Sequence, residues 1–158
     1  MPALRSGAAA ALALALLGCG AAPLPSHLGG LRRARVWTGQ RATNMVTRLH
    51  GRQVAAGSST VAEYGRRGEL RVWLTRYPDA AKASTDLKAM LARLRSGATP
   101  FTRPLEQSDQ PGRWFTVGPG GHHVLWVAGS ALYWVEGEPG RVQRAVGELP
   151  RPSAGLWT

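Results

Sequence analysis

The sequence predicts an α+β fold: one small domain in which an antiparallel sheet, built from two hairpins and one further strand, carries helices packed against it. Two pairs of β-rich segments are each joined by a short turn that contains glycine, which is typical of hairpins. A helical pattern of apolar residues follows each pair. The stretch 31–150 is long enough for one core of moderate size and crowded for two.

The first expected elements are a short helix and a hairpin. The helix is expected over residues 40–50, where apolar residues recur at helical spacing and a glycine follows (Met45, Val46, Leu49, then Gly51). The hairpin has strands over residues 54–64 and 69–77, both containing β-formers. The sequence GRRG at 65–68 supplies its turn.

A second helix is expected from Asp79 to about Ser96. Asp79 is a typical N-cap residue, and Gly97 suits a helix C-terminus. Its apolar stripe repeats at helical intervals: Ala83, Leu87, Met90, Leu91 and Leu94. A polar loop over residues 98–111 then leads to a strand at 114–117 and to the turn GPGG at 118–121.

The second hairpin pairs residues 122–128 with 131–136. Its connection, Gly129 and Ser130, suits a type II′ turn, which predicts that 128 faces 131, 126 faces 133, 125 faces 134 and 123 faces 136. Alternation along the strands places Trp126 and Trp134 on opposite faces. Because both faces are apolar, we expect central strands that are covered on each side.

The chain ends in a third helix and a tail. Pro139 suits the first turn of the helix, Pro150 ends it, and a stripe of apolar residues lies between them (Val142, Ala145, Val146, Leu149). The tail at 151–158 is expected to be loose. The two hairpin-plus-helix units, 54–95 and 122–149, suggest a degenerate duplication, although no residue-level identity supports one.

Candidate catalytic and metal-ligating residues are few, and the sequence predicts neither an enzyme nor a cofactor. No GxSxG motif occurs. His122 and His123 are neighbours in a strand and point to opposite faces, so they cannot chelate one metal ion. His123 is expected opposite Glu136, where a hydrogen bond at the rim of the sheet is the simplest role.

The charge of the chain is strongly basic, with 20 Lys+Arg against 9 Asp+Glu. Ten arginines lie between residues 30 and 76, against only two acids. A basic segment is attracted to anionic lipid headgroups, and Arg66 and Arg67 in the first turn are the candidate contacts with a membrane or an anionic polymer. Nucleic acid is the other common partner of basic chains, and it is not expected here because of the N-terminal residues described below.

Six tryptophans are a heavy load for a chain of this size. Core packing explains most tryptophans in small domains. The alternative is that Trp73, Trp126 and Trp134 line a groove for a glycan, a lipid or a peptide. A cavity in the folded domain would favour ligand binding, whereas a filled core would favour a purely structural role.

The first nineteen residues indicate export. Arg5 precedes an apolar run from Ala8 to Leu17, which is too short for a membrane span of about 20 residues. The ending LLGC at 16–19 resembles the lipobox of bacterial lipoproteins. The resemblance implies that residues 1–18 are a signal peptide, that the Cys19 thiol receives a diacylglyceryl group, and that the new amino terminus is acylated. An ordinary cleaved signal remains the alternative, since Gly18 and Ala21 also suit the general signal peptidase.

The lipoprotein resemblance implies a location in the bacterial cell envelope. Residues 19–30 would form the lipidated N-terminus and a flexible tether, with a domain over 31–150. Gly20, in place of an aspartate, implies the outer membrane if the source is diderm. We therefore expect a non-enzymatic envelope lipoprotein, either a binding or structural module that contacts an envelope protein or polymer, or a ligand-binding module with a tryptophan-lined groove.

Overall fold

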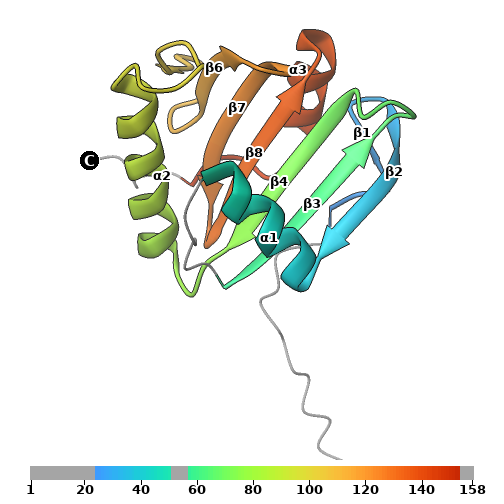
Figure 1. The fold of residues 1–158 in the computed structure, drawn as a ribbon. Helices are drawn as coiled ribbons and strands as arrows, with labels where there is room; N and C mark the ends of the chain where they lie inside the picture. The colour runs from blue at the N-terminus through green and yellow to red at the C-terminus, as the bar shows by residue number, and fades with distance from the viewer. Residues whose placement is uncertain (1–23, 51–56, 154–158) are drawn as a thin grey trace, which may run out of the picture.

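The computed structural model describes residues 24–50 and 57–153, and these form one domain around an eight-stranded antiparallel sheet (Figure 1). The strand order is β1-β2-β3-β4-β8-β7-β6-β5. The strands are β1 (His27–Leu28), β2 (Leu31–Thr38), β3 (Ser58–Tyr64), β4 (Leu70–Arg76), β5 (Leu105–Glu106), β6 (Trp114–Gly118), β7 (Gly121–Ala128) and β8 (Ala131–Gly137). The helices are α1 (Gly39–His50), α2 (Ala80–Arg95) and α3 (Pro139–Glu148). The predicted α+β class with a single domain is confirmed.

Helices cover both faces of the sheet: Figure 1 shows α1 and α2 in front and α3 behind. On the front face, α1 packs Ala42 and Val46 against Val61 of β3, while α2 packs against β7 and β8. The rear core unites α3 with β4, β7 and β8. The expectation that β7 and β8 are central and covered on each side is therefore confirmed.

The second hairpin has the predicted register. Ala128 faces Ala131, Trp126 faces Tyr133, Leu125 faces Trp134 and His123 faces Glu136. Gly129 has φ +59°, and no described residue other than glycine has a positive φ, so Ser130 does not require the left-handed region. This combination fits a type II′ turn, in which only the first central residue has a positive φ.

The long helix α2 also begins and ends where the sequence predicts. The Asp79 carboxylate accepts a hydrogen bond of 2.7 Å from the backbone N–H of Lys82, which caps the first turn. At the other end Ser96 is the C-cap, and Gly97 follows with φ +74°. Leu87 and Leu91 are almost completely buried against the sheet.

The two hairpins join through β4 and β8, a contact that no local pattern predicts. These strands pair along their whole length, with Trp73 opposite Trp134. At the end of the junction a Cβ on Gly137 would lie 2.3 Å from the backbone oxygen of Glu69, so only glycine fits there without a shift of the backbone. The junction makes one continuous sheet out of the two hairpin-plus-helix units.

Three strands, β1, β2 and β5, are additional to those the sequence predicts. Each lies at or next to an edge of the sheet. The strand β2 reads LRRARVWT, and most of its residues are exposed. Arginines on a strand near an edge discourage pairing with other chains, but they also hide the alternation by which strands are recognised.

Two predicted domain boundaries need correction. Leu24 and Leu28, assigned to the tether at 19–30, are buried in the rear core, and the Tyr64 hydroxyl donates to the Pro25 carbonyl at 2.9 Å. The folded domain therefore includes residues 24–30. At the other end, the Ser153 N–H donates to Val127 at 3.0 Å, so the domain also holds the start of the tail at 151–158. The signal peptide and Cys19 lie outside the described residues.

Candidate functional site

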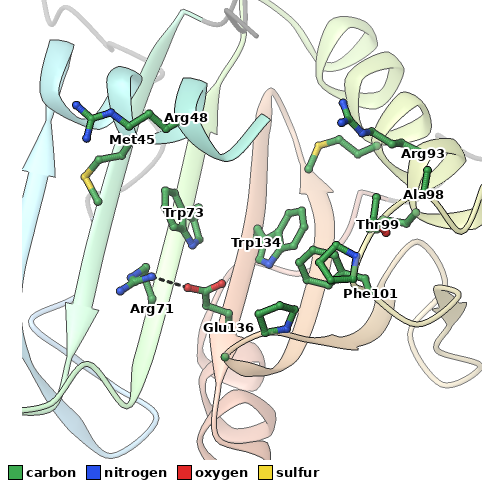
Figure 2. Close-up of a pocket in the computed structure, with 15 residues that line it drawn as sticks. Met45, Arg48, Arg71, Trp73, Arg93, Ala98, Thr99, Phe101, Trp134 and Glu136 are labelled. Carbon is green, nitrogen blue, oxygen red and sulfur yellow. Dashed lines mark hydrogen bonds and ion pairs between the residues drawn. The ribbon is translucent and has the colours of Figure 1, made fainter. Parts of the chain in front are cut away.

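An open groove of about 740 Å³ lies over the centre of the sheet, between α1 and α2 (Figure 2). Its lining residues come from both helices, from β4 and β8, from the loop after α2 and from the β6–β7 turn. Volumes of roughly 300–1,000 Å³ are typical of small-molecule sites. Two of the three candidate groove residues named from the sequence, Trp73 and Trp134, lie here as cross-strand neighbours.

The groove exists because the two front helices pack on different parts of the sheet. The helix α1 packs on β2 and β3, and α2 packs on β7 and on β8. Between them, part of the face of β4 and β8 has no helix above it. The side chains that point forward there, Trp73 and Trp134, form the floor of the groove (Figure 2).

The walls of the groove are mainly apolar and adaptable. Met45 reaches it from α1 and Met90 from α2, and both are partly buried. Methionine is flexible and polarisable, which suits surfaces that adapt to a ligand. Phe101, from the loop after α2, meets the Trp134 ring edge-to-face with 5.6 Å between centroids.

One end of the groove carries a cluster of paired charges. The Arg71 guanidinium donates to Glu136 at 2.8 Å and to Glu63 at 2.6 Å, and its Cζ lies 5.6 Å from the centroid of the Trp73 ring. Arg35 lies 3.9 Å from the second oxygen of Glu63. Two carboxylates and two guanidinium groups thus compensate one another, and Arg71 is held above Trp73.

Two further arginines line the groove, Arg48 on α1 and Arg93 on α2 (Figure 2). Both are exposed. Neither guanidinium group forms a hydrogen bond or an ion pair with a residue that the structure describes. The groove therefore has two positive charges on its helical sides that its own carboxylates do not compensate.

His123 lies beneath the groove and is completely buried. Its Nε2–H donates to the carbonyl of Pro119 at 2.9 Å, and its Nδ1 accepts from the indole N–H of Trp134 at 2.9 Å. Because Nδ1 must accept, the ring is the neutral Nε2–H tautomer. Burial lowers the pKa of His123 below its ordinary value, although Glu136, 3.5 Å from Nδ1, opposes the shift.

His123 therefore does more than the rim hydrogen bond expected from the sequence. It faces Glu136 as predicted, but it is interior and fixes the orientation of Trp134 on the groove floor. The contact between His123 and Trp134 could have been predicted from the register of the hairpin. Residues diagonal to one another across a hairpin share a face, and Trp134 is diagonal to His123. Arg71, Met45, Met90 and Phe101 were missed, because only the β4–β8 junction and the helix positions bring them to the groove.

Trp126, the third predicted groove residue, is not in the groove. It lies on the rear face, is completely buried, stacks on Tyr133 with 5.0 Å between ring centroids, and donates its indole N–H to the Pro150 carbonyl at 2.8 Å. The alternation of strand residues already separates it from Trp134. The groove prediction is thus wrong for Trp126.

Two polar atoms beside the groove lack hydrogen-bond partners among the described residues, the indole N–H of Trp73 and the hydroxyl of Thr99. A buried polar group without a partner costs about 1–3 kcal/mol. Both atoms are themselves buried, so a ligand in the groove would reach them only after a movement of the side chains around them.

The remaining candidate residues lie away from the groove. Arg66 and Arg67 are exposed in the β3–β4 turn. Within residues 24–50 and 57–153, no group of three or more His, Cys, Asp or Glu side chains could hold a metal ion. None of the helices in the described part of the chain is long and apolar enough to cross a membrane.

Comparison with known proteins adds no relative from which a role could be transferred. No family model, no curated protein and no solved structure matches the chain.

Proposed function

We propose that this chain is a non-enzymatic lipoprotein of the bacterial cell envelope, anchored through acylated Cys19, whose domain binds an acidic amphiphile in the groove between α1 and α2. In a diderm source the expected location is the outer membrane. The observation that carries the binding role is the groove itself, open and floored by Trp73 and Trp134. Trp73 is partly exposed on this floor, whereas Trp134 is buried at 6% exposure and presents only a small part of its ring.

The apolar part of the ligand is inferred from the lining. Methionines and a phenylalanine surround the two indoles, and few polar atoms interrupt them (Met45, Met90, Phe101). Burial of apolar surface stabilises a complex by about 25 cal/mol per Å² before the costs of association are subtracted. A hydrocarbon chain or an aromatic body gains from this lining, whereas a glycan would leave many hydroxyl groups without partners.

The acidic head is inferred from charge. Arg71 is already shared by Glu63 and Glu136. Arg48 and Arg93 remain uncompensated beside the groove, and a carboxylate or phosphate is the group that guanidinium recognises best. An apolar body with one anionic end therefore matches both parts of the site.

The ligand class is tested with probes that share one alkyl chain and differ in charge. Tryptophan fluorescence of the mature chain carrying Cys19→Ser is titrated with dodecanoate and with dodecyltrimethylammonium, both below their micelle concentrations. We expect dodecanoate to bind about fivefold or more tightly than the cation, which corresponds to roughly 1 kcal/mol from the arginines. Equal binding of the two probes would disprove the acidic head, and binding of neither would disprove the groove as a ligand site.

A matched pair of substitutions locates the binding. Ala98 is exposed at the groove wall, so Ala98→Phe adds a ring to the groove without touching the core, and Ala98→Ser serves as its control. We expect dodecanoate affinity to drop at least tenfold in the phenylalanine variant only, as for a blocked apolar pocket. Unchanged affinity in both variants would place the bound probe elsewhere.

The anchor is tested separately by intact mass of the protein isolated from its native membrane. We expect the mass of residues 19–158 plus acyl chains, and loss of the acyl mass in Cys19→Ser. A mature chain without acyl groups would leave the groove proposal standing and disprove the anchor.

A further inference from the structure

We propose that a second surface of the domain docks on the anionic headgroups of the membrane and turns the groove away from the bilayer. This basic face is formed by six arginines: Arg32, Arg33, Arg66, Arg67, Arg141 and Arg144. The contact between the basic face and the headgroups does not depend on the lipid anchor. The orientation of the domain in the native envelope does depend on the anchor proposed above.

The arginines of the basic face come from three chain segments that meet at one corner of the domain. Figure 1 shows the β3–β4 turn, β1 and the start of β2 together at the right of the sheet, with α3 behind them. The Gly65 N–H donates to the Arg32 carbonyl at 2.9 Å, which ties the turn to β2. Arg32, Arg33 and Arg66 line one surface depression of about 500 Å³.

The helix α3 completes the basic face. Arg141 donates from Nη1 to the carbonyl of Gly29 at 3.3 Å, and the guanidinium groups of Arg141 and Arg144 both lie beside Gly30. Gly29 and Gly30 form the turn between β1 and β2. The six arginines are thus linked through the two turns at this corner.

Charge favours an anionic partner over a neutral one. Three glutamates lie among the six arginines, Glu69, Glu138 and Glu148. The face therefore keeps an excess of three positive charges, and Arg32, Arg66, Arg67 and Arg144 are exposed. Each arginine near an anionic leaflet strengthens binding about fivefold.

The path of the chain favours a bilayer as the source of that negative charge. Arg33 donates from Nη1 to the carbonyl of Leu24 at 2.7 Å, so the chain enters the folded domain beside the basic face. Only four residues lie between Cys19 and Leu24, so the two are at most about 18 Å apart. A lipid on Cys19 would hold the face close to the headgroups, where electrostatic attraction acts over about 8–10 Å.

The position of the groove follows from the same geometry. Leu24 and α3 belong to the rear core, whereas the groove opens on the front face between α1 and α2. A domain that rests on its basic face keeps the groove open to the aqueous side. The ligand would then be exchanged with a partner or a carrier in water and not with the anchoring leaflet directly.

The contact is tested with the mature Cys19→Ser chain and sedimented vesicles that mix phosphatidylglycerol with phosphatidylcholine. One variant replaces Arg32, Arg66, Arg67 and Arg144 with glutamine. The matched control replaces four exposed arginines outside the basic face, which are Arg48 and Arg93 at the groove, Arg95 on α2 and Arg103 in the loop after α2. Both variants lose the same net charge. We expect partition to fall about fivefold for each charge removed from the basic face, to fall much less in the control, and to be absent for pure phosphatidylcholine.

Equal losses in the two variants would show that net charge alone binds the vesicles and would overturn the proposal. Loss only in the control would assign the membrane contact to the groove side. Because the chain in this assay has no anchor, the outcome is independent of the mass measurement on Cys19. Circular dichroism of both variants checks that the exposed substitutions leave the fold intact.

The orientation is tested with single cysteines in the same background, Arg66→Cys on the basic face and Ala98→Cys at the groove, each carrying an environment-sensitive dye. On anionic vesicles we expect an aqueous quencher to reach the dye at residue 98 at least about threefold faster than the dye at residue 66. Equal quenching, or protection of residue 98 alone, would overturn the orientation.

Discussion

The two faces of the sheet are built from the same strands but are covered differently by the helices. On the rear face, α3 and the segment around Leu24 and Leu28 cover the centre of the sheet, and Trp126 stacks on Tyr133 without exposure. On the front face two helices pack toward the flanks, and Trp73 and Trp134 form a groove floor. The position at which a helix crosses the sheet therefore decides whether a tryptophan is fully covered or borders an open groove.

The largest difference in stability is expected between alanine substitutions of one tryptophan from each face, Trp126 at the rear and Trp73 at the front. Trp126→Ala should lower the free energy of unfolding by about 3–5 kcal/mol, because it leaves a cavity and an unpaired Pro150 carbonyl. Trp73→Ala should cost less than about 2 kcal/mol, since its ring is only partly buried and its N–H has no partner to lose. Urea unfolding of both variants measures the difference. Equal losses would show that the groove floor is packed like the core.

A second contrast uses two alanines. Ala145 of α3 is completely buried, so Ala145→Phe should destabilise the fold by about 3 kcal/mol through overpacking. Ala98→Phe, on the groove wall, should change stability by less than about 0.5 kcal/mol. Thermal unfolding of the two proteins is the measurement. A large loss in Ala98→Phe would mean that the groove has no free space for a ring.

The support beneath the groove is tested at His123. His123→Ala removes the partners of the Trp134 N–H and of the Pro119 carbonyl, and should cost about 2–3 kcal/mol. Trp134 should also lose its fixed orientation, which near-ultraviolet circular dichroism reports. His122→Ala is the matched control, and an equal loss there would contradict a special role for His123.

The smallest effect is a pH dependence of stability. Because burial lowers the pKa of His123, the unfolded chain takes up a proton as the pH falls through about 6.5, whereas the folded chain does not. The free energy of unfolding should therefore fall as the pH drops below that value, by at most about 1.4 kcal/mol per pH unit. His123→Gln should remove this contribution, measured as the difference from wild type in urea unfolding between about pH 7.5 and pH 5.

Local patterns in the sequence predict much of this fold. The second hairpin and its register follow from Gly129, Ser130 and the alternation of apolar residues, and α2 follows from Asp79, Gly97 and its apolar stripe. Both depend on residues close together in the chain. Such signals survive without any knowledge of the tertiary structure.

Features that depend on distant contacts could not be predicted. The strand β2 pairs with β3 across α1, and its arginines give no alternation. The candidate site was predicted in part: two of three tryptophans lie in the groove, but Arg71, Met45 and Met90 reach it only through the β4–β8 junction and the separation of the helices. The assignment of Leu24 and Leu28 to a tether failed because short apolar residues among prolines and glycines give no periodic signal.

The junction between β4 and β8 is also the contact of the sheet that we expect to form late during folding. Trp73 and Trp134 are about 60 residues apart in the chain, so each hairpin can form early while their pairing must close a long loop. Each hairpin supplies only one of the two tryptophans of the groove floor, so the floor is incomplete until β4 and β8 pair. The ligand proposed for the groove would therefore bind only the completed domain, and by mass action it would stabilise the contact between β4 and β8.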